Sequence, residues 1–150
     1  MNRREKGLTL IELAMVAVII GILALMSGAM LLNAADKAKE GVVKANVATA
    51  SSSFIFKLNE SADVNVEELI PQVVAELNDP DGVEDSSDEI KSPYNSEIFA
   101  FTTDAAAEAG QVTVTTDDSH SVIIKGYGEK GSAGSPIMTK TVTPIESSES

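Results

Sequence analysis

The sequence predicts an α+β protein in which a long N-terminal α-helix packs on a small antiparallel β-sheet. Two observations predict the helix. Residues 8–32 form an apolar run with one charged side chain, Glu12, and an apolar stripe at helical spacing continues from there to residue 59. A third observation predicts the sheet, because the C-terminal half holds four short strand-like runs separated by turn residues. At 150 residues the chain has room for one domain, or for one domain and a membrane segment.

The composition excludes several classes of function. The chain carries 23 acidic and 11 basic side chains, a net charge of −12, which argues against a nucleic-acid-binding face. It has no cysteine and one histidine, so disulfides, thiolate nucleophiles and sites that need two imidazoles are excluded. No nucleophile–base pair or phosphate-binding loop is recognisable. The sequence therefore predicts a protein that is not an enzyme and needs no cofactor.

The apolar run at residues 8–32 is longer than the roughly 20 residues that cross a bilayer as a helix. The basic residues before it place the N-terminus in the cytoplasm, so residues 33–150, which are strongly acidic, lie outside. The alternative is a cleaved secretory signal peptide, for which Ser27–Ala29 offers a small-x-small site. The length of the run and the carboxylate of Glu12 favour the membrane anchor.

The helical pattern extends beyond the apolar run. There is no proline between residues 33 and 59, and an apolar stripe there predicts that one helix face is buried. A second helical pattern covers residues 66–77, where Asn65 and Glu68 resemble a capping box. Pro71 interrupts this pattern, so we expect a kinked helix or two short ones. The apolar stripe between residues 33 and 59 consists of Val43, Val47, Ala50, Phe54 and Leu58.

The sequence of the C-terminal half predicts a β-sheet. Residues 78–97 are a polar loop, and residues 126–136 form a second loop between the last two strands. Four strands joined by turns suggest an antiparallel sheet that covers the apolar stripe of the long helix. The expected strands are Ile98–Thr103, Val112–Thr116, Ser121–Lys125 and Ile137–Thr143.

Residues 6–13, KGLTLIEL, resemble the processing motif of type IV pilins and of the pseudopilins of type II secretion and competence systems. The family pattern is a short basic leader that ends in Gly, then a large apolar residue, Thr, Leu, an apolar residue, Glu and a long apolar helix. All of these features occur here in that order. A carboxylate inside an apolar span costs a few kcal/mol, so its presence by chance is rare.

The resemblance implies roles for three residues. Gly7 would be the last leader residue, and a prepilin peptidase would cut between Gly7 and Leu8. The same enzyme type would methylate the new α-amino group of Leu8. Glu12 would pair with the amino terminus of a neighbouring subunit during assembly, because an unpaired charge in an apolar environment is costly. The implied parts are a leader at 1–7, a transmembrane and assembly helix at 8–32, and a type IV pilin-like globular domain at 33–150.

Two positions depart from the family pattern. The first mature residue is Leu8, where Phe is usual, and Ala29 stands where many major pilins have Pro. Gly21 and Gly28 either loosen the helix locally or allow close helix–helix packing, and the sequence leaves both interpretations open.

The predicted function is that of a structural subunit of a type IV pilus or a similar filament. The alternative is a pseudopilin of a type II secretion or competence system, and a remote alternative is a membrane-anchored binding domain. The implied partners are further copies of the chain, a prepilin peptidase/methyltransferase, an assembly platform and minor pilins, but no nucleic acid. The implied location is the cytoplasmic membrane, with the N-terminus inside, and afterwards an extracellular filament.

An acidic loop that also holds Glu84, Asp88 and Glu89 offers weak candidate cation ligands, Asp79, Asp81 and Asp85. The EF-hand template fails there because Gly82 comes two positions too early and Val83 takes the place of a ligand. A solvated acidic loop is therefore favoured over a metal site. The single histidine, His120, opens a strand and is expected to be structural.

Overall fold

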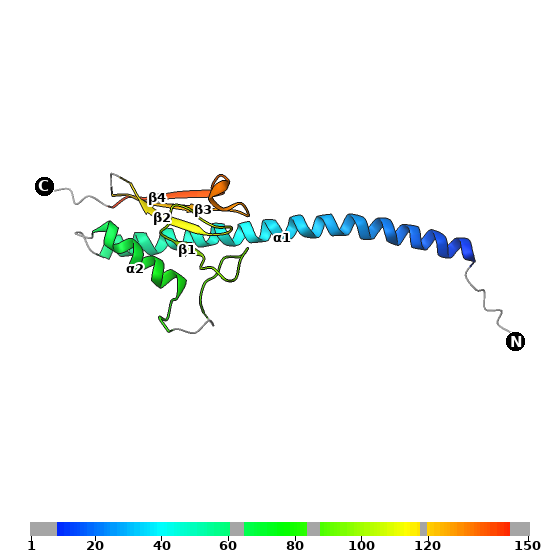
Figure 1. Ribbon diagram of the computed structural model, residues 1–150, viewed down its shortest axis with the longest axis horizontal. Coiled ribbons are helices and arrows are strands. Elements are labelled where there is room, and N and C mark those ends of the chain that lie inside the picture. Colours follow the sequence, from blue (N-terminus) through cyan, green and yellow to red (C-terminus); the bar gives the residue numbers. More distant parts are fainter. Residues whose placement is uncertain (1–8, 61–64, 84–87, 118–119, 145–150) are drawn as a thin grey trace. The chain divides into compact units, whose positions relative to one another are not determined.

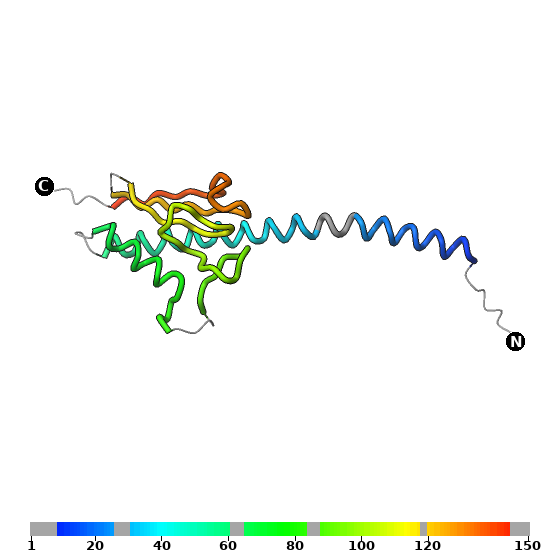
Figure 2. Tube along the Cα trace, viewed as in Figure 1, coloured from blue at the N-terminus to red at the C-terminus, as the bar shows by residue number. Residues whose placement is uncertain are grey.

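A computed structural model describes residues 9–60, 65–83, 88–117 and 120–144, without the side chains of residues 26–30. The chain divides into two compact units, residues 1–36 and residues 37–150. Figure 2 follows the trace of the chain through both units, and Figure 1 labels the elements. The boundary falls inside the first helix, so that helix contributes to both.

Helix α1 runs from Leu10 to Glu60, which confirms the predicted long N-terminal helix. It contains no proline, and its first half is rich in Leu, Ile, Ala and Met. Among the described residues, none of the helices combines the length and the apolar character that a membrane crossing requires.

The second half of α1 buries the predicted apolar stripe. All five of its side chains are at most 8 % exposed, whereas Lys44, Ala48 and Ile55 on other faces are exposed. The five residues follow one another at spacings of three or four, so they lie on one face of the helix. Burial of that face against the sheet holds this part of α1 in place.

Helix α2 runs from Val66 to Asn78 as one helix, although it contains Pro71. Its first turn is capped by Asn65, whose side chain accepts a hydrogen bond from the Glu67 amide at 3.0 Å. The predicted cap residue is therefore confirmed, and of the two expectations at Pro71, a kinked helix or two short ones, the two short helices are wrong. Pro71 removes one backbone donor, but the helix buries an apolar face on both sides of it, from Val66 to Leu77, and this packing keeps the helix in one piece.

Four strands form one sheet in the order β1-β2-β3-β4. β2 pairs with β3 and β3 with β4 in antiparallel register, as predicted, but β1 pairs with β2 in parallel. The sheet is therefore mixed, and the prediction of an antiparallel sheet is wrong for its first pair. The strands are β1 (Phe101–Thr102), β2 (Val112–Thr116), β3 (Val122–Gly126) and β4 (Met138–Val142), with a short 3-10 helix, η1 (Gly131–Ala133), before β4.

The parallel pair follows from the path of residues 103–111. Two parallel neighbours need a connection that carries the chain back to the start of the first strand, and this loop does so. It is held by backbone bonds to the loop before β4: the Ser132 amide donates to the Ala107 carbonyl at 2.7 Å, and the Gly110 amide donates to the Gly128 carbonyl at 3.1 Å. Gly110 has a positive φ of 77°, which a side chain would strain.

Asn78, the last residue of α2, takes the place of a strand beside β1. Its side-chain amide donates to the Phe101 carbonyl at 2.9 Å, and its side-chain oxygen accepts from the Phe101 amide at 3.0 Å. Both residues are buried. One side chain therefore satisfies both backbone groups of Phe101 on the edge of β1 that faces away from β2.

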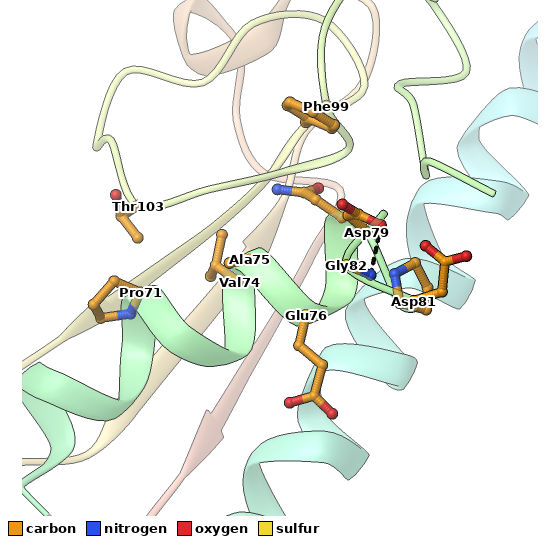
Figure 3. A pocket seen from close by; sticks show the side chains of 11 residues that line it. Pro71, Val74, Ala75, Glu76, Asp79, Asp81, Gly82, Phe99 and Thr103 are labelled. Carbon is orange, nitrogen blue, oxygen red and sulfur yellow. Dashed lines mark hydrogen bonds between the residues drawn. The ribbon is translucent and has the colours of Figure 1, made fainter. Parts of the chain in front are cut away.

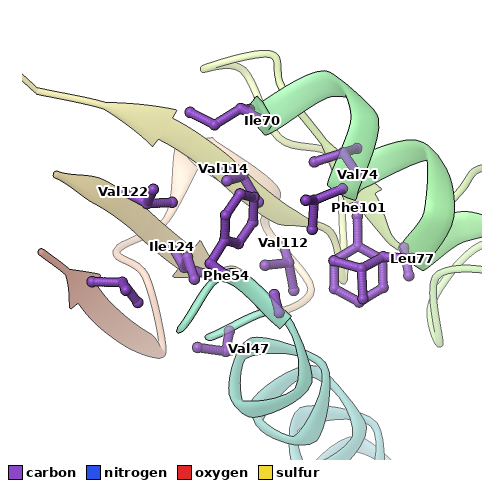
Figure 4. Close-up of a cluster of buried hydrophobic side chains, with 14 of the residues drawn as sticks. Val47, Phe54, Ile70, Val74, Leu77, Phe101, Val112, Val114, Val122 and Ile124 are labelled. Carbon is purple, nitrogen blue, oxygen red and sulfur yellow. The ribbon is translucent and has the colours of Figure 1, made fainter. Parts of the chain in front are cut away.

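The core lies between the second half of α1, helix α2 and one face of the sheet. Figure 4 shows Val47 and Phe54 of α1 pointing toward Val122 and Ile124 of β3. The backbone of Gly126 comes so close to α1 that an added Cβ would lie 2.7 Å from a methyl group of Val47. Glycine is required there by the close approach of helix and strand.

Candidate functional site

The start of α1 is closed by reciprocal hydrogen bonds between Thr9 and Glu12. Oε2 of Glu12 accepts from the Thr9 amide and from the Thr9 hydroxyl, both at 2.9 Å. In return, the Glu12 amide donates to the Thr9 hydroxyl oxygen at 3.3 Å. This is a capping box, and it satisfies backbone donors that the first helical turn leaves free. The carboxylate is thereby held at the positive end of the helix dipole.

The capping box fixes where the carboxylate can act. Glu12 is exposed, and its second oxygen, Oε1, accepts no hydrogen bond from the residues that the structure describes. The group is thus oriented toward the N-terminal end of the helix, with one oxygen available to a cation. The sequence analysis identified Glu12 but not the role of Thr9 as the cap residue. A Thr followed three residues later by a Glu is the sequence signature of a capping box.

Two predicted site residues, Gly7 and Leu8, lie outside the described residues, so cleavage between them stays a prediction. Gly21 lies within α1, and a Cβ added there would meet nothing within 4 Å among the described residues. Gly28 also lies within α1, in the stretch whose side chains the structure does not describe. The helix continues through both glycines, which leaves their two predicted roles untested.

An apolar surface surrounds the first turns of α1. In the first unit, described by itself, large apolar side chains between residues 10 and 25 are 47 % to 88 % exposed. They point in all directions around the helix, which is typical of a helix that is covered by lipid or by other helices. The exposed residues are Leu10, Ile11, Leu13, Met15, Val16, Val18, Ile19, Ile20, Ile22, Leu23 and Leu25.

The predicted acidic loop brings three carboxylates together. One oxygen each of Asp79, Asp81 and Asp88 lies within 4.8 Å of the others, which is close enough for one cation. Oxygens of Asp79 and Asp81 already accept hydrogen bonds from the amides of Gly82 and Val83. The predicted ligand Asp85 lies outside the described residues. Asp88 belongs to the same acidic loop but was not among the three candidate ligands, because only the closure of the loop brings it to the other two.

Two of these carboxylates, Asp79 and Asp81, stand at one end of a groove of about 710 Å³ beside α2. Figure 3 shows Pro71 and Val74 of α2 on one side of the groove and Phe99 on the other, with Asp79 and Asp81 together at its end. The groove is open and mostly apolar. It contains no convergent set of polar groups of the kind that orients a small substrate.

Comparison with known proteins supports the N-terminal site. Residues 2–28 match the family model of the prokaryotic N-terminal methylation motif, which is the class III signal of type IV pilins and pseudopilins. The match includes Thr9 and Glu12, and it covers the first part of α1. No curated protein and no solved structure matches the chain.

Proposed function

We propose that the chain is the precursor of a structural subunit of a type IV pilus or a similar filament. The observation that carries the proposal is the methylation motif at residues 2–28, because this signal belongs to pilin-like precursors. The exposed apolar surface of residues 10–25 supports it, because such a helix is stable only when lipid or neighbouring helices cover it. Proteins of this kind are structural rather than enzymatic.

Processing comes first in the proposed sequence of events. A prepilin peptidase removes residues 1–7 and methylates the amino group of Leu8, while the apolar run at 8–32 holds the chain in the cytoplasmic membrane. The proposal that the chain is anchored in the membrane rests on the 25-residue apolar run in the sequence and on the methylation motif, and not on the described helices. Residues 33–150 then form the domain outside the membrane.

Assembly depends on Glu12 in this proposal. Cleavage creates a positive α-amino group one residue before Thr9, and Glu12 is the only carboxylate of the apolar run. Its Oε2 is held by Thr9, which leaves Oε1 for the amino group of a neighbouring subunit. In an apolar filament core each of these charges is costly when alone, so their pairing favours one axial stagger between subunits.

The processing step is tested by the mass of the mature chain. Co-expression with a prepilin peptidase should give a protein that lacks residues 1–7 and begins at a methylated Leu8. Replacing Gly7 by a bulky residue should leave the uncut precursor, because the peptidase must accommodate that side chain. A mature chain that begins at Met30 would establish the signal-peptide alternative and refute the proposal.

The assembly step is tested by Glu12→Ala and Glu12→Gln, with each variant at equal membrane levels. Removing one partner of a buried charge pair typically costs about 3–5 kcal/mol, so for Ala the association constant of the subunits should fall by about 150-fold or more and the yield of sheared fibres should fall sharply. Gln keeps the size and part of the hydrogen bonding, and it should impair assembly less. Normal fibre yield from a cleaved Glu12→Ala chain would show that the carboxylate does not guide assembly.

The abundance of the wild-type chain in sheared fibres distinguishes the two kinds of subunit. A chain that dominates the fibres is a major pilin, and a scarce chain is a minor pilin or a pseudopilin.

A further inference from the structure

The groove beside α2 has an apolar floor and an acidic rim. Pro71, Val74 and Ala75 of α2 lie opposite Phe99, which is 40 % exposed although it is a large apolar side chain. Glu76, Asp79 and Asp81 line the edge of the same groove. Residues 60–104 as a whole hold thirteen acidic side chains and one basic one. A partner for this groove must therefore combine apolar and basic side chains.

The chain itself carries such a surface. Five lysines of the described residues form neither an ion pair nor a contact with an aromatic ring, and two of them, Lys37 and Lys44, lie on α1. At ~100° per residue, Lys37, Lys44 and Ile55 fall within a sector of about 20° on the helix. Gly41 and Ala48 lie beside them. The five lysines are Lys37, Lys44, Lys125, Lys130 and Lys140.

We call this surface of α1 the basic stripe; it consists of Lys37, Gly41, Lys44, Ala48 and Ile55. Its small residues allow a second chain to come close to the helix. A Cβ added at Gly41 would meet nothing within 4 Å, Ala48 is exposed, and Ile55 is 48 % exposed. An amphipathic helix of this kind can lie in an apolar groove, with its charged side chains reaching the rim.

We propose that the groove beside α2 receives the basic stripe of a second copy of this chain. Ile55 and the small residues of the stripe then cover the apolar floor, and Lys44 reaches Asp79 or Asp81 on the rim. Opposite charges at the edge of such a contact fix its register and its partner. The inference rests on the proposed filament function and names the contact between its subunits.

The placement of the two surfaces explains why the contact would build a filament. Lys57 forms an ion pair with Glu76 of α2 at 3.2 Å, so Lys57 marks the side of α1 that faces α2. Ile55 is two residues earlier and points to the opposite side of the helix, at about 200°. The groove and the basic stripe are thus different surfaces of one subunit. A contact between two different surfaces leaves one of each free at the ends, and it continues in an open chain where the rotation between subunits does not close a ring.

Disulfide cross-linking between full-length chains tests the proposal, because the native chain contains no cysteine. One chain carries Ala48→Cys on the stripe and a second, differently tagged chain carries Ala75→Cys in the groove, so both substitutions leave every charge in place. The two are co-expressed with a prepilin peptidase and oxidised in the membrane fraction. Thr49→Cys is the matched control, since it is exposed on the same helix but turned by about 100° from Ala48.

The expected result is a mixed dimer of the Ala48→Cys and Ala75→Cys chains, at a yield about tenfold above that of the Thr49→Cys control. Lys44→Glu should lower this yield by about tenfold, and Asp81→Lys in the partner chain should restore it. Equal yields for the control, a predominance of symmetric dimers through Ala75→Cys, or no dimer at all would overturn the proposal. The mass of the mature chain is read in the same samples. A cleaved chain without the mixed dimer overturns this contact alone, whereas an uncleaved chain counts against the proposed function.

Discussion

Replacing Asn78 by Ala should loosen β1 and lower the stability of the globular unit. The amide of Asn78 makes two hydrogen bonds to the backbone of Phe101, at 2.9 Å and 3.0 Å, and Phe101 is 2 % exposed. A buried backbone group without a partner costs about 1–3 kcal/mol. Since Asn78 is 9 % exposed and water can replace part of the loss, we expect a cost of about 2–4 kcal/mol for the two bonds together.

Amide hydrogen exchange of the full-length chain in detergent measures this effect at the site. The Phe101 amide should exchange at least about thirtyfold faster in Asn78→Ala, as a change of 2 kcal/mol implies. Asn78→Asp keeps the acceptor for this amide but loses the donor, so it should lower global stability with a smaller effect on Phe101 exchange. Asn59→Ala, at an exposed position near the end of α1, is the matched control. Unchanged exchange at Phe101 in Asn78→Ala would refute the role assigned to this side chain.

Three further substitutions test other parts of the structure. Phe54→Ala should cost about 3–5 kcal/mol in chemical denaturation because Phe54 is fully buried, while Phe56→Ala at a 60 % exposed position should change stability little. Gly126→Ala should destabilise by about 1–3 kcal/mol in the same assay, because its Cβ would collide with valine methyl groups of α1. Thr9→Val should weaken the start of α1 by about 0.5–2 kcal/mol, seen as faster exchange of the Glu12 amide, and Thr9→Ser should not; equal exchange in both variants would contradict the capping box.

The helices could be predicted from the sequence because their signals are local. The apolar run and the stripe ending at Leu58 repeat at helical spacing, and Asn65 is a cap residue placed directly before an apolar pattern. β2 was predicted with its correct limits, because Val112–Thr116 is bounded by turn residues on both sides. These features depend on neighbouring residues alone.

The features that were missed depend on contacts between distant residues. The parallel pairing of β1 follows from the path of residues 103–111, which is fixed by bonds to the loop before β4, and no local pattern records those bonds. The sequence left open whether Pro71 kinks one helix or separates two, because burial of α2 on both sides of Pro71, which outweighs the local penalty of proline, is not visible in a local pattern. Asp88 joins Asp79 and Asp81 for the same reason, because the fold of the loop decides which carboxylates meet.

The burial of the α1 stripe also constrains the order in which the chain can fold. Ribosomes synthesise the N-terminal residues first, yet β3, whose Gly126 lies against Val43 and Val47, begins only at Val122. Contacts between residues so far apart in sequence form late, whereas the antiparallel pairs β2–β3 and β3–β4 close over short turns and can form early. Until β3 is synthesised, Val43 and Val47 therefore lack their partner in the sheet, although α2, which belongs to the same core, is complete by residue 78. The speed at which the last three strands pair therefore sets how long these two valines stay open to contacts with other apolar surfaces.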